Sequence, residues 1–415
     1  MSITSDQLPL TDTAAPSDQA ELAAVVRQAY EDGTPLYPLG GGTCLEYGLS
    51  AKLPGWGLSL AGLDRVVDYP SRDMTITVEA GITMADLAAE LAREGQRLPI
   101  DAAQANAATL GGVVAVNFSG PRRYGHGTVR DYVIGISAVD GRGTPFKGGG
   151  RVVKNVAGYD FCKLLTGSFG TLAVITQLTL KVKPLAEASA ILACQPRDLA
   201  QAESLLAELA ASPSTPAAIE LLAGPEWNDS PELAVEVAAA AKLLVGLEGT
   251  RGEVDWTVDE INRSWRAAGV ASCDVHRNEA AEPIWRRLTE FGARPDAPLT
   301  MKLSVRPSAV TRMVALCQEL DPGCSLVSHA GNGIVLARFR EFSAADTSRV
   351  IVQHLQPAAA AAGGSAVVWS CAAGELTRQA IWGGARDDAE MMRSVKRQFD
   401  PKGLLNPGRF VYGTP

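Results

Sequence analysis

Three consecutive glycines, Gly40-Gly41-Gly42, are the residues of this chain best suited to holding a charged ligand. They follow a short apolar run, Leu36 to Leu39, that is typical of a β-strand, and Thr43 comes directly after them. Glycines leave backbone N–H groups uncovered, and such groups can converge on a phosphate. A tight turn explains the same residues equally well, so both interpretations stay open for this loop alone.

Two further glycine clusters strengthen the phosphate interpretation. One is Gly111-Gly112, directly after Thr109-Leu110, and the other comprises Gly158, Gly167 and Gly170. Each alone is more typical of a turn or a packing point. Taken together with the first loop, they indicate a long, extended ligand that carries phosphate.

Two standard nucleotide motifs are absent. A Rossmann fingerprint would need glycine where Leu45 stands, and a P-loop would need Gly-Lys followed by Ser or Thr, which occurs nowhere in the chain. The sequence therefore supports neither a nicotinamide site of the Rossmann type nor an ATP site of the P-loop type.

The elements around these glycines alternate in short units up to Pro184. Apolar spacing predicts a helix over Glu21 to Tyr30, and Thr83 with Asp86 resembles a capping box that opens another helix. Strands are predicted at Met74 to Glu79, Val133 to Val139 and Leu172 to Val182, with a hairpin at Asp140-Gly141. Beyond Pro184, alanine-rich helices (198–211, 232–244 and 259–268) are separated by strand-like runs (299–305 and 333–339), and a last helix covers 387–399. This change predicts a second α+β domain.

Composition narrows the class of protein. A chain of 415 residues with 46% hydrophobic and 20% charged residues is expected to form a globular protein of two or three domains. The net charge of −8 repels phosphate backbones, so we expect no nucleic-acid partner. Seven scattered cysteines without a Cys-x-x-Cys pair indicate reduced thiols and no iron–sulfur cluster. We expect no secretory signal, because Met1 to Ala20 has no basic start and no apolar run. We expect no transmembrane segment, because Gly363 and Gly364 interrupt the long uncharged stretch 358–374.

Several segments, taken in chain order, resemble the FAD-linked oxidases of the vanillyl-alcohol-oxidase (PCMH) superfamily. They are Pro38–Thr43, Val78–Gly81, Pro99–Asp101, Ala108–Gly112 with Asn117, Lys154–Asp160, Gly167–Leu172, Phe399–Pro401 and Leu405–Arg409. Within the superfamily, the segments Gly120–Gly125, Gly127–Asp131 and Lys154–Asp160 are most similar to the FAD-binding subunits of glycolate oxidases.

The resemblance implies an α+β fold with a PCMH-type two-part FAD-binding domain and an α+β cap domain. We expect a flexible tail at 1–19, the FAD-binding domain at 20–183 with subdomains at about 20–68 and 69–183, the cap at 184–385, and a C-terminal segment, 386–415, that returns to the FAD-binding domain.

The resemblance also implies which residues bind FAD. The expected cofactor-binding residues are Pro38, Leu39, Gly40, Gly41, Gly42, Thr43, Pro99, Asp101, Thr109, Gly111, Gly112, Asn117, Gly120, Gly170, Ile175 and Asn406. Some relatives attach FAD through a His just after the glycine loop. Thr43 and Cys44 stand there, so we expect FAD to be bound non-covalently.

The catalytic residues of the superfamily are incomplete in this chain. Oxidation of a 2-hydroxy acid needs a base, a hydride acceptor and a cation that holds the carboxylate. Catalytic members carry His-x-Gly-Asp-Gly-Asn-x-His; here His329 keeps the start, Asn332 replaces the acid and Leu336 replaces the second His. A second motif, Glu-His-Gly-x-Gly, has no equivalent around 369–374. We therefore expect no metal site.

Two residues remain as catalytic candidates, His329 and Arg123. His329 is the best candidate for a retained site residue, although a packed His explains it equally well, and Arg123 lies with Arg122 near the expected flavin segment, where a solvated basic loop is the alternative. His126 could also approach flavin, and His354, in an apolar helical stretch, is expected to be a packed residue.

These observations favour a FAD-binding subunit of a glycolate-oxidase-like complex, with an incomplete active site of its own and a role in electron relay or assembly. The expected partners are a sister catalytic flavoprotein subunit, an iron–sulfur subunit and a small 2-hydroxy acid substrate. The expected location is cytoplasmic, or peripheral at the inner membrane through partners. The alternatives are a stand-alone FAD-dependent dehydrogenase of a hydroxy acid or alcohol and a non-enzymatic scaffold that has lost FAD.

Overall fold

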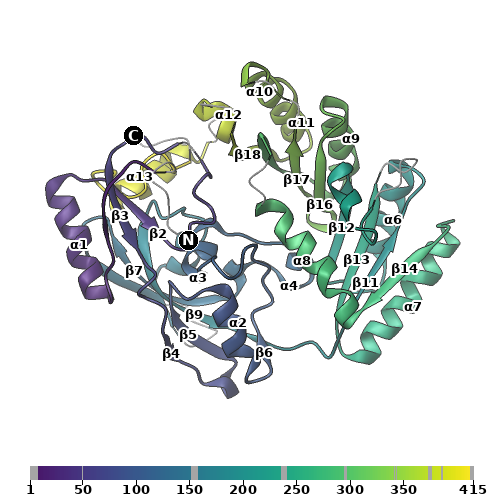
Figure 1. Ribbon diagram of the computed structural model, residues 1–415, viewed down its shortest axis with the longest axis horizontal. Helices are drawn as coiled ribbons and strands as arrows, with labels where there is room; N and C mark the ends of the chain where they lie inside the picture. Colours follow the sequence, from purple (N-terminus) through teal and green to yellow (C-terminus); the bar gives the residue numbers. More distant parts are fainter. Residues whose placement is uncertain are drawn as a thin grey trace. The chain divides into compact units, whose positions relative to one another are not determined.

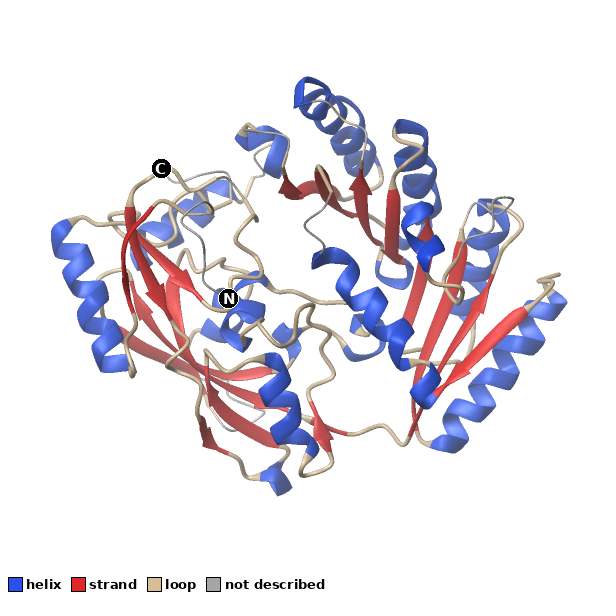
Figure 2. Ribbon diagram, viewed as in Figure 1, coloured by secondary structure: helices blue, strands red, loops and turns tan. Residues whose placement is uncertain are grey.

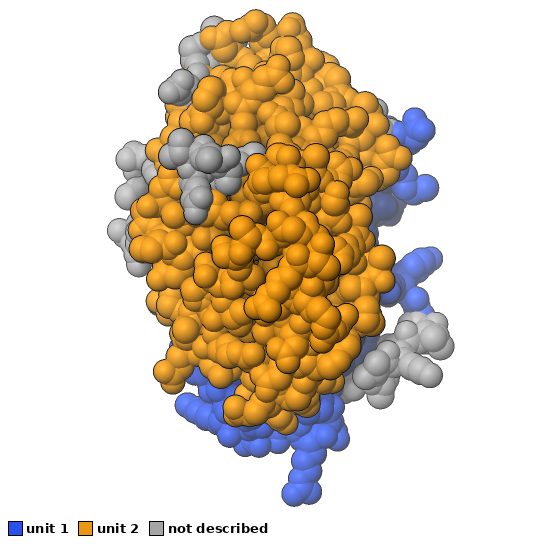
Figure 3. Space-filling view, turned by 90° about the vertical axis from the view of Figure 1, so that its right-hand side faces the viewer, with its two compact units in different colours: residues 1–119, 128–185, 384–415 blue, residues 120–127, 186–383 orange. Residues whose placement is uncertain are grey.

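The chain divides into two compact units in the computed structural model. It describes residues 8–48, 50–150, 158–234, 241–293, 297–340, 342, 344–372, 376–384 and 387–411. Unit 1 comprises residues 1–119, 128–185 and 384–415, and unit 2 comprises 120–127 and 186–383 (Figures 1 and 3). Parts of four expectations lie outside the described residues, namely 1–7 of the tail, 154–157 of a flavin segment, 235–240 of a helix and 373–374 of the second catalytic region.

Unit 1 contains two principal sheets and several short helices. Its strands are β1 (Leu10–Ala14), β2 (Leu36–Leu39), β3 (Gly55–Ser59), β4 (Val66–Asp68), β5 (Thr75–Glu79), β6 (Gln96–Arg97), β7 (Val133–Asp140), β8 (Pro145–Gly149), β9 (Ala173–Lys181) and β10 (Lys183–Pro184). Its α-helices are α1 (Gln19–Asp32), α2 (Met84–Ala92), α3 (Leu110–Val116), α5 (Phe161–Leu165) and α13 (Ala389–Phe399), with 3₁₀ turns at Ser71–Asp73 and Val129–Asp131. The predicted helices over 21–30 and 387–399 and the predicted strands at 36–39, 74–79, 133–139 and 172–182 are confirmed, whereas β1, β3 and α3 were not predicted.

The first sheet is parallel, in the order β1-β3-β2. Its strand β1 corrects the expectation of a flexible tail over 1–19, at least for the described residues from Leu8 on. Leu8 is only 3% exposed and packs with Tyr37 and Leu39. The polar segment Leu10–Ala14 forms a strand because it pairs with the edge of β3 and because the neighbouring apolar cluster buries Leu8.

The second sheet is antiparallel, in the order β4-β5-β9-β7-β8. All five residues of β5 are buried, as expected for a strand covered on both faces. The hairpin between β7 and β8 follows Asp140, whose side chain accepts hydrogen bonds from the N–H groups of Arg142 and Thr144. Helix α2 begins at Thr83, whose Oγ1 accepts from the N–H of Asp86, so the predicted capping residue is confirmed.

The C-terminal segment lies against the glycine-bearing strand of the first sheet. The N–H of Leu36 donates to the oxygen of Leu404 at 2.8 Å, and the N–H of Asn406 donates to the oxygen of Leu36 at 2.8 Å. These bonds continue the β2 edge and place the last described residues beside the loop that follows Leu39.

Unit 2 is built on one eight-stranded sheet in the order β14-β11-β13-β12-β16-β17-β15-β18 (Figure 2). Its strands are β11 (Ala188–Cys194), β12 (Ala218–Ala223), β13 (Lys242–Gly249), β14 (Cys273–Arg277), β15 (Leu299–Ser304), β16 (Ser325–His329), β17 (Ile334–Phe339) and β18 (Ser365–Cys371). Its α-helices are α4 (Arg123–His126), α6 (Leu199–Ala211), α7 (Arg251–Ala267), α8 (Glu282–Glu290), α9 (Val310–Leu320), α10 (Ala344–Val350), α11 (Gln356–Ala361) and α12 (Arg378–Trp382). A π-helical turn, Ile351–Leu355, joins α10 to α11, and 3₁₀ turns lie at Pro225–Asp229, Asn278–Ala280, Phe291–Ala293, Pro307–Ala309 and Ala330–Asn332.

One face of this sheet is covered by α8, whose Ile284, Trp285 and Leu288 pack in a core cluster with Val327 and Leu336 of the sheet. The short helix α4 lies against the same part of the unit, because the N–H of Gly125 donates to the oxygen of Ala217 at 3.0 Å. We call this the α8 face of the sheet.

Two expectations about unit 2 are wrong. The helix predicted over 232–244 is contradicted at its end, because Lys242 to Leu244 begin β13, where backbone pairing with β11 and β12 outweighs the helical propensity of the preceding alanines. His354, expected to be packed, is exposed in the π-helical turn, since Ile351 and Leu355 occupy the buried side. No helix within the described ranges is long and apolar enough to cross a membrane.

Candidate functional site

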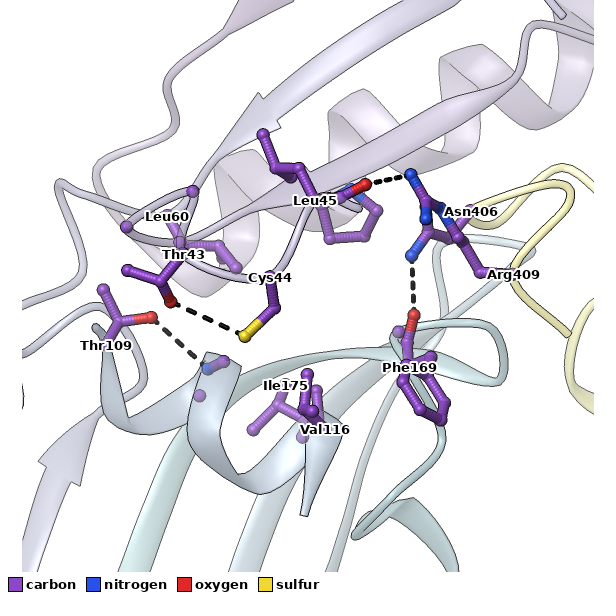
Figure 4. A pocket seen from close by; sticks show the side chains of 18 of the residues that line it. Thr43, Cys44, Leu45, Leu60, Thr109, Val116, Phe169, Ile175, Asn406 and Arg409 are labelled. Atoms are coloured by element: carbon purple, nitrogen blue, oxygen red, sulfur yellow. Dashed lines mark hydrogen bonds between the residues drawn. The ribbon is translucent and has the colours of Figure 1, made fainter. Parts of the chain in front are cut away.

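A cavity in unit 1 gathers segments that lie far apart in the sequence (Figure 4). The empty space between its lining residues is about 890 Å³, which includes space open to solvent. Its lining comprises Leu8, Pro38, Gly40, Gly41, Gly42, Thr43, Cys44, Leu45, Tyr47, Leu60, Thr109, Gly111, Gly112, Ala115, Val116, Phe169, Gly170, Ala173, Val174, Ile175, Asn406 and Arg409.

The first glycine loop needs its glycines because backbone approaches it closely. A Cβ on Gly41 would overlap the carbonyl oxygen of Ala107, and a Cβ on Gly40 would overlap Oγ1 of Thr109. Gly42 adopts a φ of 72°, in the left-handed region that side chains disfavour. The loop therefore presents bare backbone to the cavity and is pressed against the segment that opens α3.

The start of α3 forms the opposite part of the lining. Thr109 caps the helix by accepting a hydrogen bond from the N–H of Gly112 at 3.3 Å. A Cβ on Gly111 would come within 2.8 Å of the Cβ of Ala80, so glycine allows the helix to lie close to the end of β5. These contacts hold two glycine clusters, 71 positions apart at Gly40 and Gly111, beside one cavity.

The third glycine segment and the C-terminal segment meet at Asn406. Its Nδ2 donates to the oxygen of Phe169 at 2.6 Å, next to Gly170 with its φ of 64°. Arg409 donates from its guanidinium to the carbonyl oxygen of Leu45 (Figure 4) and to that of Tyr47. The C-terminal segment thus joins the loop after the first glycines to the loop before β9.

A buried ion pair fixes this junction. Lys396 Nζ donates to Asp400 Oδ2 at 2.5 Å, to the Thr171 oxygen at 2.6 Å and to the Leu405 oxygen at 3.3 Å. Asp400 in turn accepts from the N–H groups of Leu404 and Leu405. Burial lowers the pKa of Lys396, and the charge of Asp400 opposes that change. The pair ties α13 both to the glycine segment and to the last residues of the chain.

The lining fits an elongated anionic cofactor. Among its described residues Arg409 is the one charged side chain, and burial lowers its pKa to about 10, so it remains charged at neutral pH. Bare glycine amides with one guanidinium and no carboxylate suit a pyrophosphate, while Leu60, Val116 and Ile175 offer apolar walls to ring systems. Burial raises the pKa of the Cys44 thiol, which leaves it neutral.

The structure brings together most of the expected cofactor-binding residues. Those that line the cavity are Pro38, Gly40, Gly41, Gly42, Thr43, Thr109, Gly111, Gly112, Gly170, Ile175 and Asn406. Five others lie outside the lining. Leu39 packs with Leu8 and Tyr37, Pro99 and Asp101 are buried in the loop after β6, Asn117 ends α3 at a φ of 57°, and Gly120 belongs to unit 2.

Several lining residues were not expected. Leu8 was assigned to a loose tail, and its sequence signal is too short to distinguish it from a loop. Phe169 and Arg409 lie inside segments that resemble the superfamily, Gly167–Leu172 and Leu405–Arg409. The resemblance of these segments could therefore have identified both as candidate lining residues. Cys44 also lines the cavity, as the residue that stands where some relatives have the linking His.

The two catalytic candidates lie in unit 2, on elements that contact each other. His329 ends β16, only 2% exposed, and its Nδ1 lies 2.8 Å from Glu220 Oε2 on the neighbouring strand β12. Arg123 begins α4, which packs by Tyr124 against Gly331, two residues after His329. The described residues contain no group of three or more His, Cys, Asp and Glu side chains arranged to hold a metal ion.

Fold and cavity define a flavoprotein oxidoreductase with a two-part FAD-binding domain and a C-terminal domain. Residues 13–149 match the family described as "FAD binding domain", and residues 185–410 match "FAD linked oxidases, C-terminal domain". The chain belongs to the FAD-linked oxidase family, and its cofactor is FAD.

Similar proteins of known name agree with this assignment. The chain is 24% identical over 412 residues to glycolate oxidase subunit GlcD of Bacillus subtilis, which covers 95% of this chain and 87% of that protein. It is 38% identical over 165 residues to glycolate oxidase subunit GlcE of Escherichia coli, covering 40% of this chain and 47% of that protein. Alkyldihydroxyacetonephosphate synthase shares the fold, with a TM-score of 0.69 at 18% identity, over 95% of this chain and 75% of that one.

Proposed function

We propose that this chain is the FAD-binding subunit of a 2-hydroxy-acid dehydrogenase complex similar to glycolate oxidase. The observation that carries the proposal is the combination of a complete glycine-lined cavity with an incomplete catalytic motif. Leu336, where the motif has its second His, is 8% exposed and packs with Trp285 and Leu288 in the core. Such a position cannot supply a ligand or a base.

The proposal extends to domains, cofactor attachment and partners. Residues 20–183 with 386–415 would form the FAD-binding domain, and 184–385 the cap. FAD would be held without a covalent bond, since Thr43 and Cys44 stand where a linking His is found in some relatives. A sister flavoprotein subunit would oxidise the substrate and an iron–sulfur subunit would accept the electrons. Similarity to subunits of one named complex, glycolate oxidase, supports this assembly. We place the complex in the cytoplasm or at the inner membrane through these partners.

A second candidate function has one observation in its favour. The hydrogen bond between Nδ1 of His329 and Glu220 leaves Nε2 of His329 buried and without a hydrogen-bond partner among the described residues. An imidazole held in this way can accept a proton from a hydroxyl group. The chain would then be a stand-alone FAD-dependent dehydrogenase of a hydroxy acid or alcohol.

Purification from the native host separates the two candidates. We expect the chain to co-purify with a second flavoprotein and an iron–sulfur protein and to show a flavin absorbance spectrum. Acid precipitation of the protein should release this flavin into the supernatant, because the cofactor is not covalently bound. The isolated yellow chain should reduce an artificial acceptor with glycolate far more slowly than the complex does. Rapid turnover by the isolated chain would contradict the subunit role, and a colourless chain that does not take up added FAD would contradict both candidates.

A further inference from the structure

Two cysteines of unit 2 lie opposite each other at one edge of its sheet. Cys194 ends β11 and Cys273 begins β14, the edge strand, and the two residues are direct partners in the antiparallel register (Figure 2). They are 79 positions apart in the sequence, and both are free thiols. The fold therefore brings together two thiols that the sequence separates.

Both cysteines lie on the face of the sheet opposite to the α8 face. Ala193, the residue before Cys194, packs in the core cluster of the α8 face, so Cys194 and its partner point the other way. Arg277 alternates with Cys273 on this second face, and its guanidinium lies 2.6 Å from Asp255 of α7. Helix α7 is thus the neighbour of β14 on the face that carries the two thiols.

The backbone pattern places the two cysteines at the closer of the two cross-strand spacings. The sulfur of Cys273 accepts a hydrogen bond from the N–H of Ala193 and lies 3.7 Å from the oxygen of Asp274. Ala193 and Asp274 are the next partners in the register, so the N–H of Ala193 points towards β14. Because hydrogen-bonded and non-hydrogen-bonded pairs alternate along antiparallel strands, Cys194 and Cys273 form a non-hydrogen-bonded pair.

A contact at the other end of β11 agrees with this pattern. The N–H of Ser189, an even number of residues from Ala193, donates to Asn278 Oδ1 just beyond β14 at 3.1 Å. In a non-hydrogen-bonded pair the Cα atoms are about 4.5 Å apart, which is within the range of about 4.4–6.8 Å that a disulfide spans. A disulfide between the two cysteines therefore requires little movement of either strand.

The two thiols differ in access to solvent. Cys194 is 2% exposed, whereas Cys273 is partly exposed between the exposed residues Ser272 and Asp274. Burial raises the pKa of Cys273 to about 11 and that of Cys194 to about 12, and the neighbouring Cys273 thiol adds to the rise at Cys194. Oxidation of thiols follows exposure and thiolate character, so Cys273 reacts first and Cys194 is the thiol that resolves it.

A second pair of neighbouring thiols lacks this access. Burial raises the pKa of Cys324, and the neighbouring Cys317 adds to the rise. Both side chains are 0% exposed, so an oxidant in solution does not reach them while unit 2 is folded. This second pair is an internal reference for the reaction of the first.

We propose that Cys194 and Cys273 are a modification site, at which hydrogen peroxide oxidises the two thiols to a disulfide between β11 and β14. The Cys273 thiolate attacks one peroxide oxygen, the O–O bond breaks, and the hydroxide that leaves takes up the proton of the Cys273 thiol to form water. The Cys194 sulfur then attacks the sulfenic sulfur of Cys273, the S–O bond breaks, and the second hydroxide takes up the proton of the Cys194 thiol. Two thiols are oxidised and one peroxide is reduced to two water molecules. The inference does not depend on the proposed subunit function or on bound FAD.

The test treats the full-length chain with its FAD, freed of reductant and without denaturant, with hydrogen peroxide. The remaining thiols are then alkylated under denaturing conditions, and peptide mass spectrometry locates disulfides. We expect a linked pair of peptides that contain Cys194 and Cys273 of the same chain, and dithiothreitol should restore both thiols. Cys317 and Cys324 should still be alkylated as thiols.

Two variants separate the roles of the cysteines. In Cys194→Ala the sulfenic acid of Cys273 has no resolving thiol beside it, so its labelling by dimedone should rise at least about 10-fold over the wild type. In Cys273→Ser the oxidation of Cys194 should slow at least about 10-fold, because the remaining thiol is buried. The partly exposed position of Cys273 tolerates serine, so this variant tests the inference even if the buried substitution disturbs folding.

Cys371→Ser is the matched control. Cys371 is a partly exposed residue of β18, the other edge strand of the same sheet, and its cross-strand partner is Leu299 rather than a cysteine. We expect the disulfide between Cys194 and Cys273 to form in this variant at the rate of the wild type.

Three results would overturn the inference. They are the absence of a Cys194–Cys273 link in the peroxide-treated wild type, a link that joins two chains rather than one, and oxidation of Cys194 in Cys273→Ser as fast as in the wild type.

Discussion

At the scale of single residues, the cavity of unit 1 depends on glycines, because a side chain at these positions would collide with neighbouring backbone or side-chain atoms. Gly40 and Gly41 allow the first loop to touch Thr109 and the Ala107 carbonyl, and a methyl group at either position would need backbone to move. Because both neighbours belong to the segment that opens α3, a small change here alters the cavity from both sides.

Gly41→Ala tests this dependence. We expect the free energy of unfolding to fall by about 1–3 kcal/mol from overpacking, together with a roughly 10-fold or greater loss of FAD affinity. Urea unfolding and flavin fluorescence titration measure the two effects. Gly252→Ala is the control, because a Cβ at that position in α7 meets nothing within 4 Å; it should leave FAD affinity unchanged. Equal FAD affinity in both variants would show that the close approach is not needed.

Lys302 gives a residue-scale prediction about pH. Its pKa of about 8 in the folded chain lies below the ordinary value of 10.5, because burial disfavours the charge. Below pH 8 the folded chain must hold an uncompensated cation, whereas between about pH 8 and 10.5 it releases a proton that the unfolded chain still binds. The contribution of Lys302 to stability therefore rises with pH in that window.

The comparison of wild type with Lys302→Met isolates this contribution. We expect the variant to be more stable than the wild type at pH 7, and its advantage to shrink as pH rises from about 8 towards 10. Urea unfolding at a series of pH values measures the difference. A difference that stays constant over the whole series would mean that Lys302 keeps its ordinary pKa in the folded chain.

At the scale of elements, the C-terminal segment completes the cavity only because α13 fixes it. Lys396 on α13 binds the Thr171 oxygen, and Asp400 binds the N–H groups of Leu404 and Leu405. Asn406 and Arg409 follow within nine residues and line the cavity. Hydrogen bonds through the C-terminal segment thus link three parts of unit 1, namely α13, the glycine segment before β9 and the strand β2.

Asp400→Asn should uncouple that element. The substitution leaves the buried ammonium of Lys396 without its counter-charge, which is expected to cost about 3–5 kcal/mol of stability and to weaken FAD binding. Glu390→Gln on the same helix is the control, because its pairs with Arg393 and Arg397 lie at the surface, so their loss should change stability very little. Urea unfolding and FAD titration of both variants check the expectation, which fails if the two variants behave alike.

At the scale of the whole molecule, the two compact units differ in what they contribute to the FAD cavity. The described lining of the FAD cavity lies entirely in unit 1, which is discontinuous and includes both ends of the chain. The short segment 120–127 leaves unit 1 and packs with unit 2, where Arg122 lies 4.0 Å from the ring centroid of Trp285 and 2.8 Å from Glu248. This segment contains Arg123, so a short stretch between two parts of unit 1 supplies a cationic side chain to unit 2.

FAD should stabilise one of the two units selectively. A ligand that binds only the folded state at one hundred times its Kd adds about 2.7 kcal/mol of stability. Differential scanning calorimetry of the flavin-free chain is expected to show two transitions, of which added FAD raises one. A single transition that FAD raises as a whole would show that the units do not unfold independently.

The sequence by itself determined the features that short stretches of backbone encode. The glycine loops, the capping Thr83, the strands around them and the cofactor class follow from local spacing and from motifs in a fixed order, because φ preference and hydrogen-bonding capacity belong to single residues and their immediate neighbours. Strand β1 and the start of β13 could not be predicted in this way, since a partner strand rather than propensity decided their structure. Tertiary structure also decided which charges meet. Glu220 pairs with His329 across 109 positions and Lys396 reaches Thr171 across 225, while Lys302 has no acid partner among the described residues. Pairing and burial of this kind depend on the order of strands in a sheet, which no local pattern in the chain records.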